Sequence, residues 1–250
     1  MFAAFFAAAY VAAAPLDVPH AALLDVLRHD DNTPGCEAVQ LRKAVASAPV
    51  RKLGRAGGDE VVLAEVFDPC VCGAQNCPFY VLRLSTGKPR VLVSGYAISV
   101  KTKPAAELPT IVVRMHDSAL IADESTYTYR NGAYAITDSA RVRGDTQARK
   151  PNAIPVRFSA GSSSANLHGS VSIGWYDSYA FDASKGQQLR IDGVRSNAKL
   201  TLQLGMPGAG TFAELRPGVP YTLPKAGSYR LYVDNDSETD VPYTLTLAIR

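Results

Sequence analysis

From about residue 154 to the C-terminus the sequence has no helical period, so this part of the chain is expected to fold from strands. Apolar and polar residues alternate in short stretches, and Gly, Pro and Asn interrupt these stretches every ten residues or so, a spacing typical of β-sandwiches. Two of the stretches each place their apolar residues on one face: Tyr229, Leu231 and Val233 in one, and Tyr243, Leu245, Leu247 and Ile249 in the other. Such half-buried strands need a facing sheet, so we predict an all-β, jelly-roll-like sandwich over residues 154–250.

The preceding part of the chain predicts a different class of domain. Helical spacing of apolar residues appears in "AALLDVLRH" (Ala21–His29) and in "CEAVQLRKAVASA" (Cys36–Ala48), where Val39, Leu41, Ala44 and Val45 share one side. The period then changes to that of strands, at 60–67, 78–84, 90–95, 110–116, 125–130 and 133–138. We therefore expect an α+β domain over residues 15–138, with two short helices and an antiparallel meander. The polar, basic stretch 139–153 is expected to be a linker between two domains.

The first residues, "MFAAFFAAAYVAAA", are all apolar, but a transmembrane helix needs about 20 such residues. Their small residues fit a signal-peptidase site, so we expect residues 1–14 to be a secretory signal peptide, with a buried N-terminal helix as the alternative. No transmembrane segment is expected.

Four cysteines, Cys36, Cys70, Cys72 and Cys77, fit an exported chain. Because only one residue separates Cys70 from Cys72, a bridge between those two would be strained. We favour Cys36–Cys70 and Cys72–Cys77 among the three possible pairings. The alternative, a zinc site, fits the spacing poorly and has no histidine nearby in the sequence.

Composition excludes one class of partner and gives little support to catalysis. The formal net charge is only +3, and Lys and Arg are scattered, which argues against nucleic-acid binding. The chain has no Gly-x-Ser-x-Gly, His-Glu-x-x-His or phosphate-binding glycine loop, so we expect no catalytic residues and no enzyme. A hydrolase with its active site in the N-terminal domain is a further alternative.

One run, "DSYAFDASKGQ" (Asp177–Gln187), carries a family resemblance. It resembles the central signature of the bacterial periplasmic inhibitors of g-type lysozyme. The stretches "VRFSAGSSSANLHGSVSIG" (Val156–Gly174) and "TLPKAGSYRLYV" (Thr222–Val233) are similar to strands of the same family. The frame also resembles the wider pre-peptidase C-terminal (PPC-like) β-sandwich domains. The resemblance covers residues 154–250 and leaves the N-terminal domain unrecognised; its motifs are mostly architectural, with Tyr179, Phe181 and Ala183 facing the core and Gly186 supplying a turn.

What the resemblance implies about function is inhibition, because these proteins plug a lysozyme cleft with exposed loops. On that basis Trp175 and Tyr176, expected in a loop between two strands, are candidate anchors. The alternative is that Trp175 folds back onto the edge of the sandwich. The second candidate loop, around Asp234, Asp236 and Glu238, is short and acidic here, whereas the family tends to be longer and basic. An acidic loop can meet a basic lysozyme surface. Calcium held by Asp234, Asp236, Glu238 and Asp240 is an alternative use of the same loop. The interpretation we favour for the loop by itself is a solvated acidic hairpin tip.

The sequence thus predicts a periplasmic or secreted binding protein, most specifically an inhibitor of lysozyme-type muramidases. The alternative is a non-catalytic accessory module of the PPC-like kind that binds an envelope glycan or a protein.

Overall fold

The computed structural model describes residues 15–30, 36–86, 88–207 and 210–250; the expected signal peptide, residues 1–14, lies outside them. Within these ranges the chain is mostly antiparallel β-sheet with two short helices. It divides into two compact units. One holds the residues up to Ile98 with Thr102–Thr110 and Tyr129–Ala135, and the other holds Ser99–Lys101, Ile111–Thr128 and Ile136–Arg250. Neither helix of the described part is long and apolar enough to cross a membrane.

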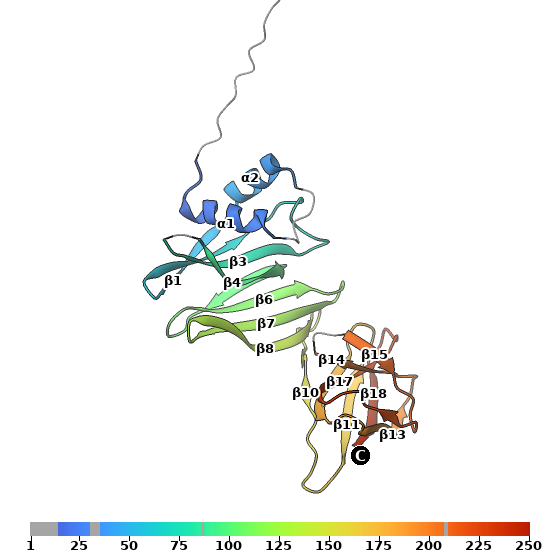
Figure 1. Cartoon of the computed structure of the whole chain (residues 1–250). Coiled ribbons are helices and arrows are strands. Elements are labelled where there is room, and N and C mark those ends of the chain that lie inside the picture. Colours follow the sequence, from blue (N-terminus) through green and yellow to red (C-terminus); the bar gives the residue numbers. More distant parts are fainter. Residues whose placement is uncertain (1–14, 31–35, 87, 208–209) are drawn as a thin grey trace, which may run out of the picture. The chain divides into compact units, whose positions relative to one another are not determined.

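The first unit places helices α1 (Val18–Arg28) and α2 (Ala38–Ala46) on one face of an antiparallel sheet (Figure 1). The sheet has the order β1-β2-β3-β4, with strands β1 (Val50–Ala56), β2 (Asp59–Glu65), β3 (Cys77–Leu84) and β4 (Arg90–Ala97). Leucines of both helices meet apolar residues of β2 and β3 in one core, which includes Leu23, Leu27, Leu41, Val62 and Leu82. Burial of these apolar side chains is what holds the short helices in place, because helices of this length are marginal alone.

Both helices were predicted, with small differences at their ends, but one of their side chains was assigned to the wrong face. Leu41, Ala44 and Val45 are buried, whereas Val39 is 81% exposed. Strand β1 was not predicted, because its sequence "VRKLGRA" is rich in basic residues. It is an edge strand, and most of its side chains are exposed, so no apolar alternation marks it.

The two predicted disulfides, Cys36–Cys70 and Cys72–Cys77, are confirmed. All four cysteines are bonded, which removes the zinc alternative. The first bridge links the chain before α2 to the turn that precedes β3, and the second closes the loop at the start of β3.

A further sheet has the order β5-β6-β7-β8-β9, with strands β5 (Ser99–Lys103), β6 (Thr110–His116), β7 (Ile121–Arg130), β8 (Ala133–Arg143) and β9 (Arg149–Pro151). The segment 139–153, expected to be an irregular linker, instead contains the end of β8 and all of β9. These two strands pair with each other, for example Arg141 with Lys150. The linker expectation is therefore wrong for most of this segment, whereas the domain boundaries themselves stay a prediction.

The C-terminal part of the second unit forms the predicted sandwich (Figure 1). One sheet has the order β10-β12-β17-β14-β15, with strands β10 (Ile154–Pro155), β12 (Asp177–Ala183), β17 (Gly227–Asp234), β14 (Thr201–Met206) and β15 (Gly210–Glu214). The other has the order β11-β18-β13-β16, with strands β11 (Ser164–Val171), β18 (Val241–Ile249), β13 (Gln188–Ser196) and β16 (Tyr221–Thr222).

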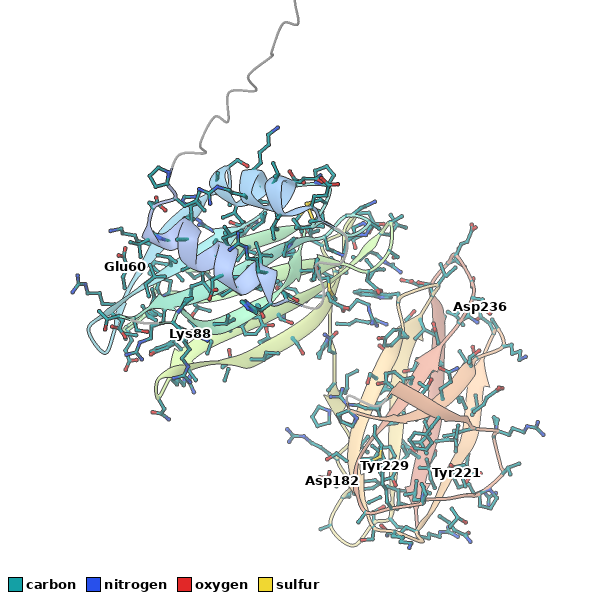
Figure 2. The ribbon with its side chains drawn as sticks, turned by 45° about the horizontal axis from the view of Figure 1, so that its top comes forward. Glu60, Lys88, Asp182, Tyr221, Tyr229 and Asp236 are labelled. Carbon is teal, nitrogen blue, oxygen red and sulfur yellow. A yellow bond between two sulfur atoms is a disulfide. The ribbon has the colours of Figure 1, made fainter. Side chains whose placement is uncertain are left out.

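The inward faces of these strands were predicted correctly. Tyr179 and Phe181 of β12 are buried, and Ala183 packs against the same core. The ring of Phe181 stacks on that of Tyr229 with centroids 5.8 Å apart, and Figure 2 shows Tyr229 inside the sandwich. Gly186 has φ +86°, the left-handed conformation expected at the turn.

The run Asp177–Gly193 does not form a paired hairpin, although its turn sits between two strands. Strand β12 belongs to one sheet and β13 to the other, so the turn at Gly186 carries the chain across the core. The same is true of β17 and β18, which flank the acidic loop. That loop is therefore an arch over the end of the sandwich and not the tip of a hairpin, and such arches fix residues of both sheets at one place.

Candidate functional site

The two predicted anchors, Trp175 and Tyr176, follow a tight turn that begins at the end of β11. The amide of Trp175 donates to the carbonyl of Ser172 over 2.7 Å, and Gly174 supplies a positive φ of +68°. This turn points Ile173 outward, with 61% of its surface exposed, and turns the next side chain toward the protein.

Trp175 is only 4% exposed, so its ring packs back onto the sandwich and does not project from the loop. The guanidinium of Arg143 lies 4.9 Å from the centroid of its ring, and the ammonium of Lys150 lies 5.0 Å from it. Cations over an indole face are attracted by the ring's quadrupole. The ring is thus held inside by side chains of the segment that was expected to be a linker.

Tyr176 is half-buried and has a similar cover. The guanidinium carbon of Arg141 lies 3.3 Å from the centroid of its ring, and the ring of Tyr232 meets it edge-on at 5.7 Å. Arg141 is itself buried, and the nearest carboxylate oxygen, on Asp123, is 3.9 Å from its Nε. Direct contact of Trp175 and Tyr176 with a partner stays a prediction. Neither side chain, however, presents a fully exposed ring to solvent.

A buried polar network lies beneath these rings. The Lys150 ammonium is 2.8 Å from Oδ1 of Asp177, and the other oxygen of that carboxylate accepts a hydrogen bond of 2.7 Å from the Tyr243 hydroxyl. The Tyr179 hydroxyl is 2.7 Å from that of Tyr243 and also donates to the carbonyl of His168. Charged hydrogen bonds of this kind are strong where water is excluded.

The environment shifts the pKa values of three members of this network. Burial lowers the pKa of Lys150, and the nearby Asp177 opposes that shift in part. Burial raises the pKa of Tyr179 to about 12. Burial and the Asp177 carboxylate raise the pKa of Tyr243 further. All three shifts follow from the removal of these groups from water.

The acidic loop, Asp234 to Asp240, splits its carboxylates between two environments. Asp240 accepts hydrogen bonds from Arg143 at 3.0 Å and from the Ser172 hydroxyl at 2.9 Å, and the bond from Arg143 lowers its pKa. Asp234 is half-buried, and burial raises its pKa. Asp236 and Glu238 are exposed. The four carboxylates therefore do not share one environment.

This arrangement does not gather a calcium site at Asp234, Asp236, Glu238 and Asp240. Over the residues that the structure describes, no three His, Cys, Asp or Glu side chains are placed so that they could hold a metal ion.

The loop is nevertheless well fixed, and the residue that fixes it is Asn235, which is 6% exposed. Its side-chain amide donates to the carbonyl of Lys199, and its side-chain oxygen accepts from the amide of Ser237 over 2.7 Å. The carbonyl of Ser237 in turn accepts from the amide of Ile173 over 2.8 Å. The exposed residues Ile173, Asp236 and Glu238 thus stand on two loops joined by hydrogen bonds; we refer to these three as the loop face.

Sequence reasoning missed Arg141, Arg143 and Lys150, which it placed in a linker. The available signal was the alternation of the two arginines around an apolar residue, Val142, which is typical of a strand. Each charged group around Trp175 faces an opposite charge or an aromatic ring. Arg141, Arg143 and Lys150 therefore fix the end of the sandwich. The loop face stays accessible.

These features define a class: a β-rich, disulfide-bonded chain whose C-terminal sandwich presents fixed loops at one end. No family model matches the chain, and no curated protein matches it.

Solved structures similar to this chain include three periplasmic inhibitors of g-type lysozyme called PliG. The Aeromonas hydrophila protein is 23% identical, with 39% of this chain and 96% of that one covered and a TM-score of 0.35. The Salmonella Typhimurium protein is 26% identical, with 40% and 100% covered and a TM-score of 0.36. A mutant of the Escherichia coli protein is 23% identical, with 39% and 97% covered and a TM-score of 0.33. All three TM-scores are below 0.5.

Proposed function

We propose that this chain is an exported binding protein that inhibits lysozyme-type muramidases through the loop face of its C-terminal sandwich. The observation that carries the proposal is the fixed acidic loop, which presents the Asp236 and Glu238 carboxylates to solvent while Asn235 holds its backbone. The resemblance of residues 154–250 to the lysozyme inhibitors supplies the target. The two disulfides support a periplasmic or secreted location, because such bonds persist in oxidising compartments.

A fixed loop suits a binder because little conformational freedom is lost when it docks. The loop face also combines two kinds of contact. Ile173 offers an exposed apolar side chain, and the carboxylates of Asp236 and Glu238 belong to the loop that is hydrogen-bonded to it. An apolar anchor with charged neighbours fits a partner surface that has an apolar hollow and basic surroundings.

In this proposal Trp175 and Tyr176 act indirectly. They pack beneath the turn that presents Ile173, and Asp240 links that packing to the acidic loop through Ser172. Their substitution would disturb the loop face through the fold rather than remove a contact with the muramidase.

The test is inhibition of g-type lysozyme by the purified chain, measured as the rate of lysis of bacterial cells. We expect near-stoichiometric inhibition that weakens with salt, because the carboxylates act through charge. The Asp236→Asn/Glu238→Gln variant should need about tenfold more protein for half inhibition, which corresponds to ~1.4 kcal/mol.

Asp182→Asn is the matched control, because Asp182 is also exposed but lies at the opposite end of the sandwich from Asp236 (Figure 2). Its inhibition should equal that of the unsubstituted chain. Unchanged lysis at a large molar excess of protein would refute the proposal, and equal losses in both variants would refute the assignment to the loop face.

A further inference from the structure

The outer face of the sheet that contains β11, β18 and β13 is hollowed. The strand registers place polar side chains there in two rows that cross the sheet. One row is His168, Thr244 and Arg195, and the next is Asn166, Thr246 and Asp192. A groove of about 470 Å³ lies over the two rows and is lined by side chains of both.

A second hollow continues this groove along β11. The two share Asn166, Leu167 and His168, and the second extends to Arg157 and Pro155 at the other side of the strand. The result is one polar channel that runs from Arg195 across β11 to Arg157; we call it the β11 channel.

The β11 channel is positively charged at both ends. Arg157 and Arg195 are exposed, and neither has an ion-pair partner among the described residues. The carboxylate of the two rows, Asp192, already accepts a hydrogen bond of 2.8 Å from Arg190. Because Asp192 is paired with Arg190, it does not neutralise Arg157 or Arg195, and the channel keeps positive charge for a ligand. Free guanidinium groups bind carboxylates in a bidentate manner.

Between the arginines the channel offers neutral hydrogen-bonding groups. The Thr246 hydroxyl donates to Oδ1 of Asn166 over 2.9 Å, which fixes the Asn166 side chain and leaves its NH₂ group for a ligand. The His168 ring and the Thr244 hydroxyl are exposed beside it. An amide, an imidazole and a hydroxyl suit a ligand that is rich in hydroxyl groups between its charges.

Two other ligand classes fit this channel less well. An extended peptide would bind by adding a strand to the edge of β11, but the carbonyls of Ser164, His168 and Ser170 on that edge already accept from Ser162, Tyr179 and Lys150. A neutral glycan would want an exposed aromatic ring to stack on. The aromatic residue that lines the hollows, Tyr179, is only 3% exposed.

We propose that the β11 channel binds an acidic oligosaccharide, with sugar carboxylates on Arg157 and Arg195 and sugar hydroxyl groups on Asn166, His168 and Thr244. None of these residues belongs to the loop face, so this site and the muramidase site can fail independently.

The experiment is calorimetric titration of the full chain with tetragalacturonate, the neutral maltotetraose and hexaglutamate. We expect saturable binding of tetragalacturonate that weakens with salt, and binding of the other two at least about tenfold weaker, a difference of ~1.4 kcal/mol. Arg157→Gln and Arg195→Gln should each weaken tetragalacturonate binding about tenfold. Arg216→Gln is the matched control, because Arg216 is exposed and lines neither hollow.

The thermal midpoint of each variant shows that the exposed substitutions leave the fold intact. Three outcomes would overturn the proposal: no saturable binding of tetragalacturonate, equal or tighter binding of hexaglutamate or maltotetraose, or the same affinity in Arg157→Gln, Arg195→Gln and Arg216→Gln.

Discussion

The ammonium of Lys150 lies 2.8 Å from the carboxylate of Asp177, and the two side chains keep only 17% and 5% of their exposure. Lys150 comes from β9 and Asp177 begins β12, so the pair ties the short β8–β9 hairpin to the sandwich within one unit. Removing one partner of a buried pair leaves the other charge without compensation.

The substitution Asp177→Asn should therefore lower the free energy of unfolding by about 3 kcal/mol. The Arg190–Asp192 pair provides the control, since its side chains are 48% and 39% exposed. Asp192→Asn should cost at most about 1 kcal/mol, because water screens an exposed pair. Urea denaturation followed by circular dichroism measures both. Similar losses in the two variants would show that the Lys150–Asp177 pair is not buried as described.

The tyrosines beside this pair predict a loss of stability at alkaline pH. The pKa of Tyr179 is raised by burial from 10.0 to about 12, and that of Tyr243 is raised further. Because the folded state holds these protons more tightly, stability is present below pH 10 and is lost as the pH rises through 12. Lys150 acts in the opposite sense, since burial lowers its pKa below 10.5 and stability rises with pH up to that value.

Denaturation curves at pH 7, 10.5, 11.25 and 12 test this, with tyrosinate absorbance as the second signal. Above pH 10.5 Lys150 no longer makes the free energy of unfolding rise with pH. The tyrosines then dominate, so the free energy of unfolding should fall. The fall should be smaller in Tyr179→Phe, which lacks one of the raised groups. A flat profile from pH 10.5 to 12 in the unsubstituted chain would contradict the assignment.

Fluorescence of Trp175 gives a direct check of its position, because it is the only tryptophan of the chain. With 4% of its surface exposed and two cations over its ring, it should be quenched by acrylamide far less than free N-acetyltryptophanamide. Trp175→Ala should lower the free energy of unfolding by about 3 kcal/mol or more, as expected for a large buried aromatic residue. Quenching like that of the free compound would restore Trp175 as an exposed anchor.

The packing of Trp175 could not be predicted from local sequence patterns, because they do not show which elements pack together. Alternation with period two is a property of neighbouring residues, so the inward faces of Tyr179, Phe181 and Tyr229 could be predicted from the sequence. The partner of a strand is not a local property. For this reason β12 and β13 could be read as a hairpin although they lie in different sheets.

The candidate site was harder to predict for the same reason. Arg143 and Lys150 look like solvent-exposed linker residues, because the stretch around them is polar and basic and has no apolar periodicity. Their partners, Asp240 and Asp177, lie far along the chain, and only the fold brings them together. The disulfide pairing was predictable because strain excludes a bridge between Cys70 and Cys72, which narrows the choice.

Substitution of Asn235 distinguishes recognition of a fixed loop from attraction by charge alone. Asn235→Ala removes the hydrogen bonds to Lys199 and Ser237 but leaves the charges of Asp236 and Glu238 unchanged. The lost bonds leave the partly buried carbonyl of Lys199 and amide of Ser237 without these partners, so the free energy of unfolding should fall by about 1–2 kcal/mol. If a fixed loop is what the muramidase recognises, inhibition at a temperature where the variant remains folded should weaken about tenfold, ~1.4 kcal/mol. Thr239→Ala, which removes only an exposed side-chain hydrogen bond to Ser237 in the same loop, is the matched control and should inhibit normally. If Asn235→Ala inhibits as well as the unsubstituted chain, the loop need not be fixed, and the carboxylates act by charge alone.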